Sequence, residues 1–303
     1  MSIDEIINKL KSLDLSTYPK EEIEALFNQL GMIGSIVVTY HKGKSVIRAR
    51  PNYDGEHFTE KSQLSFKPPR FNTTYQRAST PNTTMFYATS IPDKIKDGEL
   101  DNARVIGVAE TIPLLRDKER SGYQKISFGR WVVEEDIDLV AIVHKESYLK
   151  ESSYTRELKE AYDEFSVQAP KEIMEKSLKF HTYLADEFSK EEINEDYDYM
   201  ISAIFSELIT KRGFDGVIYP SVRAGGKGFN IAITPEATKK LKLRVAGEST
   251  VYKRKEEVFV GNDAIVELNG DEEEFQMNEL NGFKTEILEK LNVQSMDELN
   301  DDD

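Results

Sequence analysis

The chain has 303 residues, of which 39% are hydrophobic, and its formal net charge is −15. This length supports one large core, or one core with small flanking elements. The absence of cysteine excludes disulfides and thiolate chemistry, argues against a structural zinc site and fits a reducing cytoplasm. We see no signal peptide and no apolar run of the ~20 residues that a spanning helix needs. We therefore expect a cytoplasmic protein with no membrane partner.

The negative charge is concentrated near the carboxyl-terminal end. Residues 255–303 hold sixteen acids and three bases, a net of −13, so the preceding residues carry about −2 of the total of −15. Residues 40–80 are locally basic, with eight Lys or Arg against three acids. A basic patch on a nearly neutral body favours a small phosphorylated ligand over a nucleic acid.

Residues 1–33 are predicted to form an N-terminal helical extension of two short helices. Ser2 and Glu5 have the spacing of a capping box, and Pro19 can begin the second helix. Alternating apolar residues in SIVVTY (35–40) and SVIRAR (45–50) then predict two strands that pair with each other through a turn at 41–44. The long loop that follows, 51–84, is of a length that is often functional.

Strand-like runs continue after the loop: MFYAT (85–89), ARVIGVAET (103–111), KISFGRWVV (125–133) and DLVAIVH (138–144). A helical block in three pieces occupies about 151–213. Two more strands, DGVIYPS (215–221) and FNIAIT (229–234), flank a glycine-rich turn, and a last β-rich piece covers about 242–261. Strands on both sides of a helical block predict an α+β domain over residues 34–261.

Residues 262–303 are predicted to be an acidic C-terminal tail. It contains one helical stretch at 276–291 and ends in DELNDDD, whose composition predicts disorder. If this tail folded over the basic residues 40–80, it would inhibit a site there.

Three groups of residues, well separated in the chain, stand out when they are read together. They are VIRARP at 46–51 with PRFN at 69–72, MFYA at 85–88 with VAET at 108–111, and FDGVIYPS at 214–221 with FNI at 229–231. This ordered set, spanning roughly residues 35–250, resembles the RES-domain family, which is named for its Arg, Glu and Ser. The chain departs from the family pattern in its N-terminal helices, its acidic tail, extra residues between Tyr87 and Glu110, and Pro69 in place of a glycine.

The resemblance implies a fold like that of the ADP-ribosyltransferases, a split β core around an NAD cleft, here with a helical insertion. It also implies cleavage of the nicotinamide–ribose bond of NAD by phosphorolysis or hydrolysis. NAD would be the substrate, inorganic phosphate a co-substrate in the first case, and no metal or further cofactor is implied. Many family members are toxins, which an antitoxin protein neutralises.

Arg48 matches the arginine of the family, and guanidinium groups suit phosphates because they are always charged and bind in a bidentate manner. Arg50, on the same strand face, and Arg70 are further candidates for ligand binding. The alternative for Arg48 is an ordinary solvated strand arginine. Asn72 is expected either to cap its loop or to bind a ribose.

Glu110 and Tyr87 match the other catalytic positions. Glu110, expected at the end of a buried strand, would hydrogen-bond ribose hydroxyls and stabilise positive charge; the alternative is an exposed glutamate at a strand end. The Tyr87 ring would stack on nicotinamide while its hydroxyl positions a nucleophile; the alternative is a core tyrosine.

The third motif supplies the remaining candidates. Ser221 is assigned to the catalytic group as a hydroxyl that binds ligand, because no histidine or GxSxG pattern accompanies it to make a nucleophile. Arg223 would cover a phosphate and Asn230 would anchor the hairpin; a plain turn serine and a flexible hairpin tip are the alternatives. Besides NAD cleavage, two other functions stay open: ADP-ribose transfer to a macromolecule, and a non-catalytic nucleotide-binding or interaction module.

Overall fold

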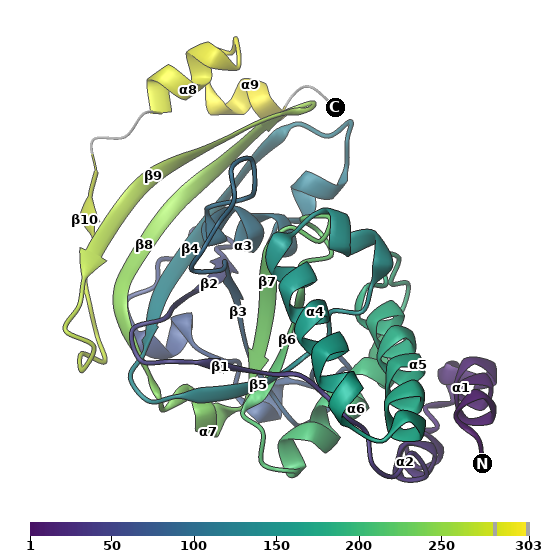
Figure 1. Cartoon of the computed structure of the whole chain (residues 1–303). Helices are drawn as coiled ribbons and strands as arrows, with labels where there is room; N and C mark the ends of the chain where they lie inside the picture. Colours follow the sequence, from purple (N-terminus) through teal and green to yellow (C-terminus); the bar gives the residue numbers. More distant parts are fainter. Residues whose placement is uncertain (281–283, 301–303) are drawn as a thin grey trace.

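A computed structural model describes residues 1–280 and 284–300, which form a mixed α+β fold around one strongly bent sheet (Figure 1). The sheet has the strand order β1-β5-β6-β7-β3-β2-β4-β8-β9-β10, and its neighbours are antiparallel except for β5 and β6. The strands are β1 Val37–Tyr40, β2 Ser45–Pro51, β3 Phe86–Ser90, β4 Gly122–Val133, β5 Ile137–Ala141, β6 Gly216–Pro220, β7 Phe229–Ile233, β8 Leu241–Arg254, β9 Glu257–Glu267 and β10 Asn278–Glu279. The helices are α1 Ile3–Ser12, α2 Lys20–Asn28, α3 Ala103–Thr111, α4 Ser153–Gln168, α5 Lys171–Phe188, α6 Met200–Lys211, α7 Pro235–Thr238, α8 Lys284–Lys290 and α9 Met296–Asn300.

The sheet consists of two halves that meet at a narrow junction. β2 pairs with β4 over its whole length, and β3 pairs with β7 over five residue pairs. Between β2 and β3, however, the register contains the single pair Ile47–Thr89. The two strands therefore separate on either side of that pair, and the space between them is available to other groups.

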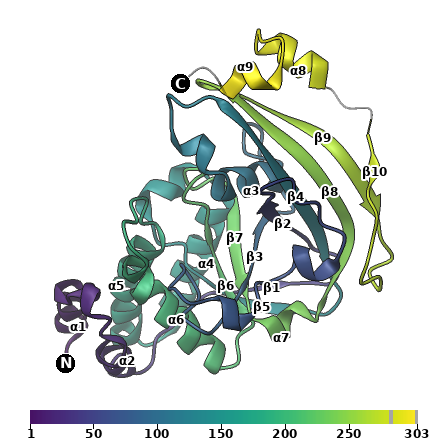
Figure 2. The ribbon, with the colours of Figure 1, turned by 180° about the vertical axis from the view of Figure 1, so that it is seen from behind.

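The N-terminal and helical predictions are confirmed. The side chain of Ser2 accepts a hydrogen bond from the backbone of Glu5, and the two complete the capping box of α1. The helical block has its three pieces in α4, α5 and α6. Helices α2, α5 and α6 cover one face of the β5–β6–β7 region, and α1 packs on the outer side of α2 and α5 (Figures 1 and 2). Val140 and Val217 pack against them, whereas Leu139 and Ile218 pack on the opposite face. Burial of both faces explains the nearly continuous apolar runs of these strands.

The segment 103–111 is a helix, α3, so its prediction as a strand is wrong. Its first turn is capped by Asn102, whose side chain accepts from the backbone of Arg104. The helix packs across β2 and β3, and Gly107 lies so close that a Cβ there would be 2.9 Å from the Cβ of Ala49. Valine and isoleucine favour strands by themselves, but in this segment the burial of one helical face outweighs that preference.

The predicted pairing of 35–40 with 45–50 is also wrong. β1 pairs with β5, and β2 lies in the other half of the sheet between β3 and β4. The turn at 41–44 instead binds across to β4, because Gly43 N–H donates to the carbonyl of Val133. The local pattern specified both strands correctly but contained no information about their partners.

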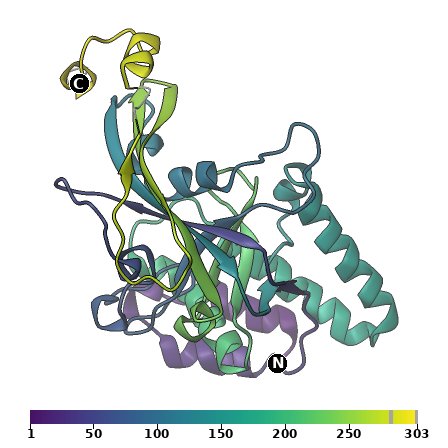
Figure 3. The same ribbon diagram turned by 90° about the vertical axis from the view of Figure 1, so that its left-hand side faces the viewer.

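The C-terminal acidic segment is mostly folded onto the sheet. β9 crosses the boundary that we expected between residues 261 and 262, and β10 pairs with it. The helix expected at 276–291 is confined to α8, after β10, and α9 occupies part of the DELNDDD stretch that composition predicted to be disordered. Residues 281–283 and 301–303 lie outside the described residues. Figure 3 shows α8 and α9 at the projecting end of the β8–β9 hairpin, where Ile287, Leu291 and Leu299 pack.

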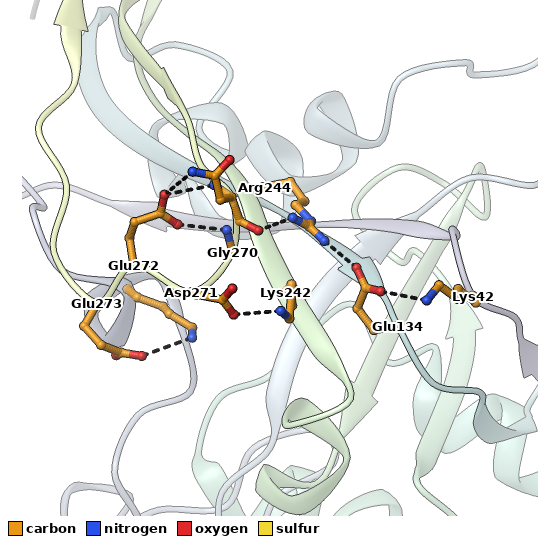
Figure 4. A network of polar contacts seen from close by, with 10 residues as sticks. Lys42, Glu134, Lys242, Arg244, Gly270, Asp271, Glu272 and Glu273 are labelled. Atoms are coloured by element: carbon orange, nitrogen blue, oxygen red, sulfur yellow. Dashed lines mark hydrogen bonds and ion pairs between the residues drawn. The ribbon is translucent and has the colours of Figure 1, made fainter.

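Ion pairs hold the acidic turn before β10 to the body (Figure 4). Asp271 pairs with Lys242 at 2.7 Å, and Glu273 pairs with Lys61 at 3.2 Å. The carboxylate of Glu272 accepts three hydrogen bonds from Asn269 and Gly270, and the two backbone N–H groups among these donors help to lower its pKa to about 2. Each exposed pair contributes little alone, so the turn is fixed by the set together with the backbone contacts between residues 59–61 and 273–275.

Candidate functional site

A cavity of about 600 Å³ opens where β2 and β3 separate. β2 forms one wall, β3 and the start of β7 form the other, and the last turn of α3 lies across them. The residues that line it are Ile47, Arg48, Ala49, Arg50, Pro51, Gln76, Arg77, Tyr87, Ala88, Thr89, Gly107, Glu110, Thr111, Arg116, Ile193, Tyr199, Tyr219, Arg223 and Asn230. Motifs that are far apart in the sequence thus meet in one place, which we call the arginine cavity.

Glu110 is fixed at one point of this cavity by three hydrogen bonds to the same oxygen. Its Oε1 accepts from Ser221 Oγ at 2.6 Å, from Asn230 Nδ2 at 2.8 Å and from the backbone N–H of Arg223 at 3.3 Å. Within the described residues, Oε2 receives no hydrogen bond. A carboxylate held in this way has one oxygen committed to the protein and one available to a ligand.

Ser221 is fully buried, does not line the cavity and donates its hydroxyl hydrogen to Glu110. Its Oγ also accepts from the backbone N–H of Ala224, which orients the hydroxyl hydrogen toward Glu110. The turn that follows packs tightly on α3: Gly228 has φ +67, and a Cβ there would lie 2.1 Å from Ile106 Cδ1. Only glycine suits both that conformation and that contact, which is how the turn brings Ser221 to Glu110.

Arg48 spans the gap between the separating strands. Its Nη1 donates to the backbone carbonyl of Tyr87 at 2.7 Å, and its guanidinium lies 5.5 Å from the ring centre of Phe86. Its buried Nε has no hydrogen-bond partner within the described residues. Burial and the neighbouring Arg50 lower the pKa of Arg48 to about 10, so the group stays charged at neutral pH. A half-buried cation with an unused donor is suited to an anionic ligand.

Arg50 is on the same strand face as Arg48 and is tied to the loop beside it. Its Nη1 donates to the carbonyl of Gln63 at 3.0 Å, and its guanidinium stacks 4.2 Å from the ring centre of Phe58. Gln63 belongs to the short 3₁₀ helix Lys61–Leu64, whose backbone and Lys61 side chain also bind the acidic turn at Glu273. The tail therefore supports the loop that holds Arg50. Among the described residues, none after Asn230 lines the cavity, so the tail does not cover it.

Tyr87 and Asn72 both hold the loop that leads into the cavity. The Tyr87 hydroxyl accepts from the backbone N–H of Ala78 and shares a 2.8 Å hydrogen bond with Ser79, and burial raises its pKa to about 12. Its ring lines the cavity, whereas its hydroxyl is engaged with the protein. Asn72 is buried and donates to the carbonyls of Thr80 and Thr83. Of the two roles expected for Asn72, the structure places it in the loop-capping one.

Arg70 is exposed, stacks 4.7 Å from the ring of its neighbour Phe71 and does not line the cavity. Two arginines that the sequence did not single out, Arg77 and Arg116, line the cavity instead. Arg77 donates to the carbonyls of Phe188 and Lys190, and Arg116 donates to the carbonyl of Glu110. Arg77 is in the long loop that we expected to be functional, but no motif distinguished it from other basic residues there.

The charged side chains that line the arginine cavity are mostly positive. Among the described residues that line it, the charged side chains are five arginines and one glutamate. Arg223 is anchored like the others, with its Nη2 donating to the carbonyl of Glu191 at 2.8 Å. Three tyrosines, Tyr87, Tyr199 and Tyr219, supply flat apolar surface. This combination of fixed positive charge, aromatic walls and one oriented carboxylate suits a ligand with phosphates, rings and a centre that becomes cationic.

A larger cavity, of about 740 Å³, lies on the other side of α3, and its lining is mainly apolar with lysines at the rim. Because it contains neither Glu110 nor the arginine cluster, we take the arginine cavity as the candidate site despite its smaller volume. The part of the chain that the structure describes has no cluster of three or more acidic or histidine side chains able to hold a metal. Over the same residues, we find no helix with the length and apolar character to cross a membrane.

Comparison of the chain with protein-family models, with curated proteins and with solved structures gave no match.

Proposed function

We propose that the chain degrades NAD by cleaving its nicotinamide–ribose bond in the arginine cavity, with water or inorganic phosphate as the acceptor. The observation that carries the proposal is the hydrogen-bonded Glu110 carboxylate among five arginines. The ADP-ribosyltransferase-like fold that the RES resemblance implies belongs to the same proposal. A ligand cavity at the joint between two half-sheets is what such a split core provides.

In this proposal each side chain has a defined task. Arg48 and Arg50 bind the pyrophosphate of NAD, and the tyrosine rings line the space for the nicotinamide and adenine rings. When the ribose C1–nitrogen bond breaks, its electron pair neutralises the pyridinium ring and positive charge develops on the ribose. Glu110 stabilises that charge through its available oxygen. A water oxygen that bonds to C1 then releases a proton to solvent, whereas a phosphate acceptor bonds to C1 through an oxygen that carries no proton.

Ser221 and Asn230 act through Glu110. Two side-chain donors and one backbone donor keep Oε1 in place, which fixes where Oε2 meets the ribose. We therefore describe Ser221 as a positioning residue. A toxin or defence role, in which an antitoxin blocks the cavity, follows from the RES resemblance and is part of the proposal on that ground alone.

Product analysis after incubation with NAD tests the proposal and separates its alternatives. Nicotinamide with free ADP-ribose indicates hydrolysis, and nicotinamide with ADP-ribose-1″-phosphate, formed when phosphate is present, indicates phosphorolysis. Label from NAD on a macromolecule would instead indicate ADP-ribose transfer. NAD that remains intact under all these conditions would refute the proposal.

A further inference from the structure

The larger cavity beside α3, which we call the valine groove, is bounded by two elements that face each other with apolar side chains. Val105 and Val108 come from α3, and Val258 and Val260 come from β9. Val105 is 48% exposed, Val258 42% and Val260 43%. Exposed apolar residues are ordinary when scattered, but here three of them line one cavity of about 740 Å³. Such a cavity is in the size range of small-molecule sites.

The rim of the groove is positively charged. Arg104, Lys118, Lys253 and Lys255 line it, with Glu256 as the acid among the described lining residues. Arg104 and Lys253 are already bound: Arg104 donates to Ser249 and Asn262, and the buried ammonium of Lys253 donates to the carbonyls of Asp117 and Arg120. Lys253 thereby fixes the loop that carries Lys118 at the rim.

Lys118 and Lys255 supply ammonium groups that have no partner within the described part of the chain. Both residues are exposed, and neither ammonium makes a hydrogen bond or ion pair with another residue in the described ranges. Lys255 occupies the β8–β9 turn with φ 53, two residues after Lys253. An apolar floor with two uncommitted cations at one end is complementary to a molecule with an apolar body and one anionic end.

The floor also indicates the shape of that body. The aromatic ring among the described lining residues, that of Phe128, is covered by the guanidinium of Arg104, 4.6 Å from the ring centre. Arg104 therefore blocks the Phe128 ring from stacking on an aromatic ligand. The branched side chains of the valines and of Leu115 can instead pack against a flexible aliphatic chain. We propose that the valine groove binds an aliphatic carboxylate, with the chain between α3 and β9 and the carboxylate at Lys118 and Lys255.

Calorimetric titration of the full chain with hexanoate, octanoate and decanoate, below their micelle concentrations, tests this assignment without reference to NAD. We expect saturable binding whose affinity rises about fourfold for each methylene that becomes buried. Decan-1-ol, which has the same chain without the charge, is expected to bind several-fold more weakly. Lys118→Gln and Lys255→Gln should each weaken decanoate several-fold, and added salt should reduce that difference.

Val105→Glu supplies the decisive variant, because the residue is half-exposed and the substitution places a carboxylate in the groove at little risk to folding. We expect it to abolish decanoate binding. Val167→Glu, at an 86% exposed position on α4 outside the groove, is the matched control and should bind normally. No saturable binding of any carboxylate, equal affinity for decan-1-ol and decanoate, or equal binding by the two valine variants would each overturn the proposal.

Discussion

Helix α3 has a cavity on each side, and the charged groups of the two cavities are held in different ways. On the side of Glu110, each of the five arginines donates to a backbone carbonyl and so has a fixed place before any ligand arrives. On the side of Val105, Lys118 and Lys255 are exposed at the rim, and neither ammonium group is bound to another described residue. Fixed donors lose little freedom on binding, which favours the positioning that catalysis requires, whereas mobile ones suit simple binding.

The largest expected effect is that of Glu110→Gln. The substitution keeps the size of the side chain but removes the negative charge that we assign to the ribose cation. We predict that kcat for nicotinamide release falls by about a thousandfold, at the upper end for loss of one electrostatic stabiliser. The exposed Glu119→Gln is the matched control in the same region and should retain normal turnover. Equal rates for the two variants would place the chemistry elsewhere.

Arg48→Gln is expected to reduce kcat/KM for NAD by about a hundredfold, because a partly buried cation that pairs with an anionic ligand is lost. Arg70→Gln, outside the cavity, should remain within about twofold of the wild type, since exposed charges contribute little. The pKa of Arg48, about 10, adds a second readout. NAD affinity should stay level across neutral pH and decline as the pH approaches that value, where the guanidinium loses its charge. A larger loss of kcat/KM in Arg70→Gln than in Arg48→Gln would show that Arg70, and not Arg48, binds NAD.

Ser221→Ala should have a smaller effect, about a tenfold loss in kcat with KM little changed, as expected for one hydrogen bond to a charged group. The variant removes the donor at 2.6 Å from Glu110 but leaves Asn230 and the backbone of Arg223 in place. Ser221→Thr retains a hydroxyl and should recover part of the rate if the buried site accepts the methyl group. A loss as large as that of Glu110→Gln would mean that Ser221 contacts the substrate itself.

The smallest effect is predicted for variants of the valine groove, which lies on the other side of α3 from the arginine cavity. Lys118→Gln and Lys255→Gln should leave NAD turnover within about twofold of the wild type, because surface charges on the far side of the helix are screened. Steady-state rates with NAD alone, without any carboxylate, provide the measurement. A tenfold loss in either variant would show that the valine groove is part of the NAD site.

Much of the site could be predicted because its residues sit in strands and turns with recognisable local chemistry. Arg48 lies on β2, which an alternating pattern predicted, and Tyr87 on β3 and Asn230 on β7 lie in segments that were predicted as strands. The glycine-rich turn after Ser221 was predicted as a turn, but its close packing on α3 was not. These features depend on neighbours in the chain, and the sequence therefore carries them.

What could not be predicted depends on contacts between distant residues. Glu110 is on a helix because α3 buries Ile106 and Val108 and needs a glycine to approach Ala49, none of which the local β-branched pattern reveals. Asn72 became a loop cap because Thr80 and Thr83 present carbonyls to it. Arg77 and Arg116 carry no motif, and their place in the cavity follows from carbonyls that the fold brings to them.

The same limit applies to strand partners. β1 and β2 are adjacent in the chain and have hairpin-like patterns, yet they are in different halves of the sheet. Register and pairing depend on which apolar faces meet in the core. β1 pairs with β5 and β2 pairs with β3 and β4, so the two strands do not pair with each other. The narrow β2–β3 joint that opens the arginine cavity depends on this arrangement. The local sequence pattern therefore did not predict the cavity, and a cleft was expected from the RES resemblance alone.

Calorimetric titration of the Glu110→Gln variant with NAD tests the assignment of the arginine cavity directly, since this variant is expected to bind the substrate and to turn it over very slowly. We predict saturable binding of one NAD per chain, weakened by about a hundredfold when Arg48→Gln is added to the same variant. The absence of saturable binding, or equal affinity with and without Arg48, would contradict the assignment of the arginine cavity as an NAD site.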